Sequence, residues 1–175
     1  MQKPKPALIN ELNTCFELLY KTANLIPEAL FNTSKENKWT PAENFSHLIT
    51  ATKMTILPFT LPKFIPVLLY GKGKGISRTY DEVVDAYESK LANGAKAAGV
   101  YVPAKTNYEQ EKISSEILKQ REKLVQAVSN KWTEEQLDNY QVKHPILGKL
   151  TMRELAYFTI YHNIHHMETI RKYYL

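Results

Sequence analysis

Apolar residues recur at alternating spacings of three and four along the first part of the chain. They are Ile9, Leu12, Phe16, Leu19, Ala23 and Ile26. Because a helix turns about 100° per residue, this spacing places all of them on one face. The pattern predicts an amphipathic helix over about residues 6–26, with its apolar face turned toward a core.

Capping boxes, in which a Thr is followed three residues later by a Glu, indicate further helix starts. The Thr residues are Thr40, Thr79 and Thr151. They predict a core-forming helix over about residues 40–57, ended by Pro58, a short helix over about 79–93, and a last helix over about 151–175. Apolar periodicity predicts one more helix over about residues 107–130.

The same periodicity predicts which side chains face inward. In these three middle helices they are Ala42, Phe45, Leu48 and Met54, then Val84, Tyr87 and Leu91, then Ile113, Ile117, Leu124 and Val128. No segment shows the period-two alternation that marks a strand. We therefore expect an all-α fold, a four-helix bundle with one long crossover that contains the short extra helix. Residues 1–175 are expected to form a single domain.

Composition narrows the classes of protein. The hydrophobic content of 43% is that of an ordinary globular domain. The single cysteine, Cys15, excludes an internal disulfide and a multi-cysteine metal cluster, and it suits a reducing compartment. No signal peptide is visible, and the apolar run over residues 56–70 is broken by three prolines. We expect a soluble cytoplasmic protein that does not partner a membrane.

The formal net charge is +5, and most of the excess lies in residues 58–80, which contain no Asp or Glu. Their cations are Lys63, Lys72, Lys74 and Arg78. No helix-turn-helix pattern or basic-aromatic interleaving accompanies them, so nucleic acid is not an expected partner. The run Gly71–Gly75 lacks the P-loop spacing. It is interpreted as a basic crossover loop that could attract an anionic ligand.

Three of the five histidines lie together on the last predicted helix. At about 100° per residue, His162 and His166 fall in the middle of its inward face, whereas His165 points some 60° away. Two imidazoles four residues apart can converge on one divalent metal ion. His47, inside the second predicted helix, is the natural third ligand. The alternative is that these histidines only bond the backbone or face solvent.

The residues that surround these histidines resemble the DinB-like, or YfiT-like, family. The similar stretches are Trp39-Thr40-Pro41-Ala42-Glu43-Asn44-Phe45-Ser46-His47-Leu48, His144-Pro145-Ile146-Leu147-Gly148 and His162-Asn163-Ile164-His165-His166. The resemblance implies an up-down-down-up bundle, often dimeric, and a divalent metal held by His47, His162 and His166. Nickel or zinc is the implied metal, with iron or manganese as alternatives. After the last histidine the chain departs from the common Arg-Gly-Gln-Ile pattern.

Family members with assigned activities imply a metal-dependent enzyme. One possibility is a transferase that adds a low-molecular-weight thiol to an electrophile; the other is a hydrolase for a small substrate. In the first case the thiol is expected to come from a small molecule, because Cys15 is interpreted as a buried apolar residue. Glu43, Tyr157 and Tyr161 are candidate proton carriers, although Glu43 also fits a capping role. His144 could tie its loop or line the site entrance. The competing class is a non-catalytic metal-binding or stress-associated protein.

Overall fold

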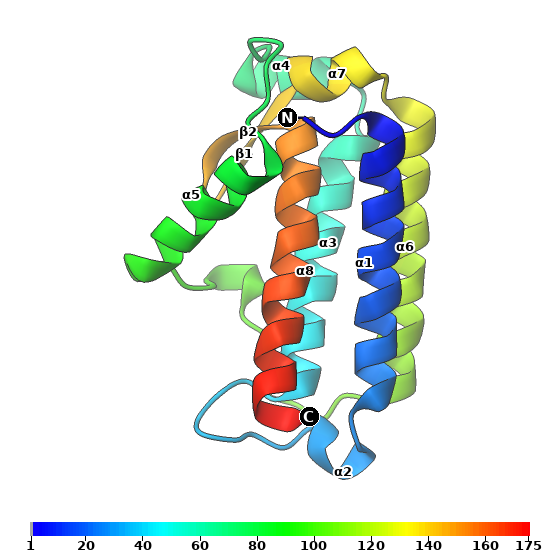
Figure 1. Ribbon diagram of the computed structural model, residues 1–175, viewed down its shortest axis with the longest axis vertical. Coiled ribbons are helices and arrows are strands. Elements are labelled where there is room, and N and C mark those ends of the chain that lie inside the picture. Colours follow the sequence, from blue (N-terminus) through cyan, green and yellow to red (C-terminus); the bar gives the residue numbers. More distant parts are fainter. Residues whose placement is uncertain (1) are drawn as a thin grey trace.

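The structure is a computed structural model that describes residues 2–175, and it is mostly helical (Figure 1). Its elements are α1 (Lys5–Leu25), α2 (Glu28–Phe31), α3 (Pro41–Thr60), α4 (Phe64–Tyr70), α5 (Tyr80–Ala92), the 3-10 helix η1 (Gly99–Tyr101), α6 (Gln110–Lys131), α7 (Glu134–Asn139), β1 (Gln141–His144), β2 (Gly148–Thr151) and α8 (Met152–Tyr174). The expectation that the chain is mostly helical is confirmed. Among the described residues, no helix combines the length and apolar character needed to cross a bilayer.

The four long helices α1, α3, α6 and α8 lie side by side, and the core fills the space between them (Figure 1). Helices α1 and α3 each pack against both α6 and α8. The predicted stripe on α1 is buried from Leu12 to Ile26, and only its first member, Ile9, is partly exposed. Each such Leu, Ile or Phe contributes about 1.5–3 kcal/mol when it leaves water, so these faces hold the helices together.

Three details of the predicted helices are wrong. Helix α3 continues past Pro58 to Thr60, because a proline in the last turn removes one backbone hydrogen bond and no more. Met54 is 44% exposed rather than part of the core. On α5 the inward residue beside Tyr87 is Val83, not Val84, since the helix lies against α8 and presents a slightly rotated face to it.

The absence of strands was also predicted wrongly. Strands β1 and β2 form an antiparallel hairpin that aligns Val142 with Leu150. Each strand has four residues and contributes few buried side chains, which is too short for an alternation to be recognised. Helices α2, α4 and α7 were missed for the same reason of length.

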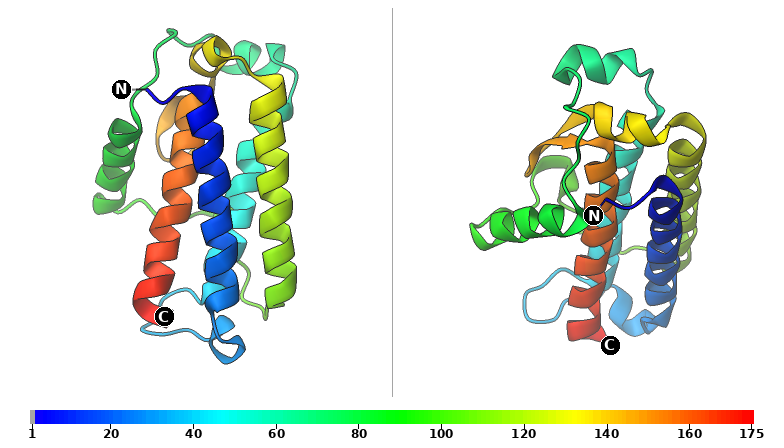
Figure 2. Two further views of the ribbon diagram at one scale, coloured as in Figure 1. Left: turned by 45° about the vertical axis from the view of Figure 1, so that its right-hand side comes forward. Right: turned by 45° about the horizontal axis from the view of Figure 1, so that its top comes forward.

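The long crossover connects the C-terminal end of α3 to the N-terminal end of α6, which lies at the opposite end of the bundle (Figure 1). It contains α4, α5 and η1, and Figure 2 shows α5 standing to one side of the long helices. Helix α5 packs against α8, and η1 packs against α3. The crossover therefore packs on both α3 and α8, the two helices that carry the histidines.

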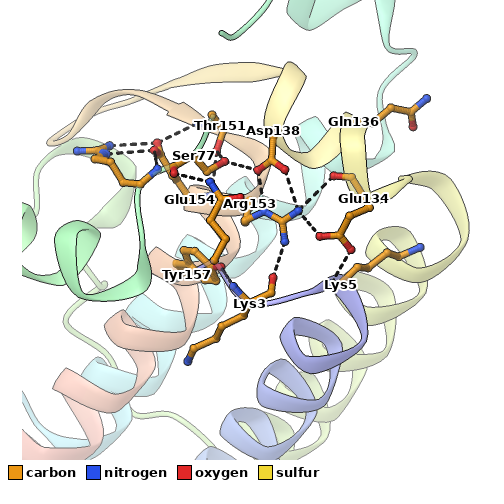
Figure 3. A network of polar contacts seen from close by, with 12 residues as sticks. Lys3, Lys5, Ser77, Glu134, Gln136, Asp138, Thr151, Arg153, Glu154 and Tyr157 are labelled. Carbon is orange, nitrogen blue, oxygen red and sulfur yellow. Dashed lines mark hydrogen bonds and ion pairs between the residues drawn. The ribbon is translucent and has the colours of Figure 1, made fainter. Parts of the chain in front are cut away.

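A buried arginine ties several segments together at the end of the bundle that contains α7 (Figure 3). The guanidinium of Arg153, which is 1% exposed, donates to both carboxylate oxygens of Asp138 at 2.7 and 2.9 Å. It also donates to Glu134 and to the carbonyl of Lys3. Ser77 from the crossover bonds Asp138 in turn. This network fixes the N-terminal segment, the crossover and α7 relative to the start of α8.

Candidate metal site

Helix α3 positions the first histidine. The Thr40 hydroxyl accepts the backbone N–H of Glu43, and the Glu43 carboxylate accepts the backbone N–H of Thr40. Pro41 occupies the first turn. This start is well defined, since both partners of the capping box are satisfied. His47 follows less than two turns later and is 5% exposed, facing α8.

Helix α8 supplies the other two histidines, one turn apart. His162 is 6% exposed and His166 is partly exposed. One ring nitrogen from each of His47, His162 and His166 lies within 4.8 Å of the others. The structure thus brings together the three side chains that the sequence singled out, although His47 lies 115 residues before His162.

Two of the three donor atoms are spaced nearly as they would be on one divalent ion. The Nε2 atoms of His47 and His162 are 3.0 Å apart. Two nitrogens on one zinc ion, each at about 2.0–2.1 Å, are separated by roughly 3.3 Å at a tetrahedral angle. Three neutral imidazoles suit zinc, nickel, iron and copper, so the donor set alone does not select the metal.

Hydrogen bonds on the far side of two rings orient them. His47 Nδ1 lies 2.7 Å from the carbonyl oxygen of Tyr101 in η1. A carbonyl only accepts, so Nδ1 carries the proton and donates it, which leaves the Nε2 lone pair for a metal. His166 Nδ1 lies 2.7 Å from Oδ1 of Asn44. Histidine ligands are commonly held in this way.

Burial keeps the three imidazoles neutral. Desolvation is the main cause that lowers the pKa of His47. Desolvation, followed by the nearby imidazoles, holds the pKa values of His162 and His166 well below the usual 6.5. Neutral imidazole is the form that binds a metal, so the cluster is ready for an ion at neutral pH without losing a proton first.

Aromatic rings surround the histidines, a feature that no sequence pattern predicted. Trp39 stacks nearly parallel to His166, with ring centroids 6.3 Å apart, and lies 5.2 Å from His47. Phe158 stacks on His162 at 5.0 Å, one turn before it on α8. Tyr87 reaches His162 from α5 at 5.9 Å. These rings limit the access of water to the nitrogens.

The remaining two histidines lie outside the cluster. His165 is partly exposed and faces Tyr87 and Tyr161. This agrees with the outward direction predicted from a turn of about 100° per residue. His144 was expected in a loop but is the last residue of β1. Its Nδ1 accepts the backbone N–H groups of Ile146 and Leu147, so it ties the hairpin turn.

The candidate proton carriers have other partners. Glu43 completes the capping box and forms an ion pair with Lys105 at 3.0 Å. The hydroxyl of Tyr157 accepts the backbone N–H of Lys3, in the network of Figure 3. Tyr161 donates to Glu88 on α5. Each of these groups is thus engaged in a structural bond rather than free beside the imidazoles.

The basic loop belongs to the other end of the molecule. The backbone of Lys72 forms an isolated β-bridge with Tyr140, the residue just before β1. Arg78 forms an ion pair with Glu154 at the start of α8. His162 follows Glu154 by eight residues, or about 12 Å along the helix axis. Because Arg78 is paired with Glu154, the charge of its guanidinium is already balanced by a protein carboxylate.

Comparison with known proteins gives one match. The family model of the DinB superfamily matches residues 11–170, which includes all three clustered histidines. No curated protein and no solved structure matches the chain.

Proposed function

The chain belongs to the DinB superfamily, and on this premise we propose that it is a metal-dependent enzyme. In this proposal His47, His162 and His166 hold one divalent ion, with nickel or zinc favoured and iron or manganese as alternatives. The observation that carries it is the convergence of three imidazoles, two of them buried and one partly exposed, within 4.8 Å of one another. A cluster of neutral polar rings in an apolar setting is costly unless something binds their nitrogens.

The proposed reaction transfers a low-molecular-weight thiol to an electrophile or hydrolyses a small substrate. When bound, a divalent ion supplies Lewis acidity, which activates a coordinated thiol or water at neutral pH. The chain itself contributes the orientation of His47 through the Tyr101 carbonyl and the exclusion of water by Trp39, Tyr87 and Phe158. Three protein ligands leave a coordination position for a reactant.

The thiol of the transferase reaction is proposed to come from a small molecule. Cys15 is buried, its Sγ bonds the carbonyl of Ile160, and desolvation raises its pKa to about 12. A thiol in that state is neither ionised nor accessible, so it does not attack a substrate.

Two further parts of the proposal concern assembly. The up-down-down-up order of the four long helices is supported by the colours of Figure 1, in which α1 and α8 run toward one end of the bundle and α3 and α6 run toward the other. A homodimer is proposed from the family resemblance alone.

A second candidate function is metal binding without catalysis. The observation that favours it is the engagement of Glu43, Tyr157 and Tyr161 in other bonds, which leaves no dedicated proton carrier among them. Under this alternative the protein would be a metal-binding or stress-associated factor.

A screen of thiol conjugation and ester hydrolysis with the metal-loaded protein separates the two functions. Turnover that disappears in His162→Ala supports the enzyme. No turnover with any thiol or ester supports the binding protein. Turnover that is unchanged in His162→Ala contradicts catalysis at this centre.

A further inference from the structure

Asn44 is a buried side chain with three hydrogen bonds, one of which reaches the histidine cluster. It is 2% exposed and lies in the first turn of α3, one turn before His47. Its Nδ2 lies 3.2 Å from the carbonyl of Trp39 and 3.0 Å from that of Thr40. Its Oδ1 lies 2.7 Å from Nδ1 of His166 on α8.

These contacts determine which way the amide points. Both backbone partners are carbonyl oxygens, which accept and cannot donate, so the NH2 group of Asn44 must face them. The amide oxygen is then the atom that faces His166. The capping turn therefore uses the two carbonyls to hold the Asn44 oxygen in one direction.

The direction of the amide oxygen determines the tautomer of His166. An oxygen that only accepts requires Nδ1 of the imidazole to carry the proton. The lone pair of His166 is then on Nε2, the nitrogen away from Asn44. Because the ring is anchored at one nitrogen and stacked on Trp39, its rotation is also restricted.

We propose that Asn44 is a positioning residue that presents Nε2 of His166 to the metal. This inference rests on the proposed function, since it assumes that the cluster binds a metal. Asn44 would orient His166 in the same way as the carbonyl of Tyr101 orients His47. Loss of such a partner typically weakens metal affinity by 10–100-fold.

The test compares zinc affinities, measured by competition with a chromophoric chelator, for the wild type and Asn44→Leu. Leucine has a similar size but no acceptor, and we expect zinc to bind roughly 10–100-fold more weakly. Thr40→Ala is the matched control, because it removes the hydroxyl that caps α3 but keeps the Thr40 backbone carbonyl that orients Asn44. Its zinc affinity should stay within about threefold of the wild type although its unfolding midpoint falls. If Asn44→Leu does not fold, Asn44→Ser replaces it, since a hydroxyl there is too short to reach His166.

Asn44→Asp provides a rescue. A carboxylate oxygen accepts the same Nδ1–H but cannot donate to the Trp39 and Thr40 carbonyls, so this variant should lose stability and keep its zinc affinity. The visible spectrum of bound Co²⁺ gives a second readout, which should change in Asn44→Leu and not in Thr40→Ala.

Three results would overturn the role of Asn44. They are wild-type zinc affinity in Asn44→Leu, an equal loss in Thr40→Ala, or an Asn44→Asp variant as weak as Asn44→Leu. A wild-type protein that binds none of nickel, zinc, iron, manganese and cobalt overturns the proposed function itself, so the two failures are distinguishable.

Discussion

The Nε2 atoms of His47 and His162 lie 3.0 Å apart, although the two residues are 115 positions apart in sequence. His47 donates from its other nitrogen to the Tyr101 carbonyl, so its Nε2 has no proton to give. In the metal-free protein, the proton between the two rings must therefore be on His162. A metal ion bound to both Nε2 atoms would require the other tautomer of His162, with the proton on Nδ1.

Zinc should stabilise the folded protein through this cluster. At a free concentration a hundred times its dissociation constant, a ligand that binds only the folded state adds about 2.7 kcal/mol. For a chain of this size that corresponds to a rise of roughly 5–10 °C in the melting temperature. Differential scanning fluorimetry with zinc or a chelator should show the rise for the wild type and none for His162→Ala. His165→Ala, which removes an imidazole outside the cluster, is the control and should respond like the wild type. An equal response in His162→Ala would place the zinc elsewhere.

The hairpin histidine should make the metal-free protein less stable in acid. Desolvation lowers the pKa of His144 from 6.5 to about 4. The unfolded chain takes up this proton below about pH 6.5, whereas the folded chain does so only near pH 4. The unfolded state is thus favoured progressively as the pH falls through this window, and the effect is absent above it.

The variant His144→Asn isolates that contribution, because an Asn oxygen can accept the same turn N–H groups and does not titrate. Urea unfolding in the presence of a chelator should show a smaller loss of stability from pH 7 to pH 5 in the variant. The difference should be roughly 1–2 kcal/mol, and identical losses would contradict the assignment.

Removing the guanidinium of Arg153 should be severely destabilising. Arg153→Met leaves Asp138 without its buried cation, and breaking such a buried pair costs about 3–5 kcal/mol. Arg121→Met removes a surface pair with Glu17 and should cost less than about 1 kcal/mol. Denaturant unfolding of both variants provides the comparison. Similar costs for the two would mean that the network of Figure 3 does not fix the end of the bundle.

Cys15 should be silent toward thiol reagents in the native protein. It is buried and its pKa is raised to about 12, so the thiolate that reacts is scarce and inaccessible. An aromatic disulfide reagent should titrate one thiol per chain in denaturant and almost none without it. The variant Cys15→Ala should retain any thiol-transfer activity. Rapid labelling of the native protein would show that this side chain is accessible after all.

The sequence contained enough information for the long helices and for the histidine pair. Long apolar periods and complete capping boxes are local signals, and the i, i+4 spacing of His162 and His166 is decided by helix geometry alone. The choice of His47 depended on a family resemblance as well as on its place in a core-forming helix. Helix α7 could have been found, because Thr133 and Gln136 form a capping box of the same kind.

Other features depend on tertiary contacts that no local pattern encodes. The acceptor for His47 is a backbone carbonyl of the crossover, which any residue at position 101 would provide. Asn44 reads as an ordinary residue of a helix start until α8 is placed beside it. Tyr87 reaches the cluster only because α5 packs on α8. The hairpin is too short for its alternation to be detected.

Metal content of the protein purified under native conditions tests the central claim most directly. Elemental analysis should find about one divalent ion per chain in the wild type, or after addition of nickel, zinc, iron or manganese. His47→Ala, measured in the same way, should hold little or none. A folded wild-type protein that contains no stoichiometric metal and gains none from these ions would contradict the account.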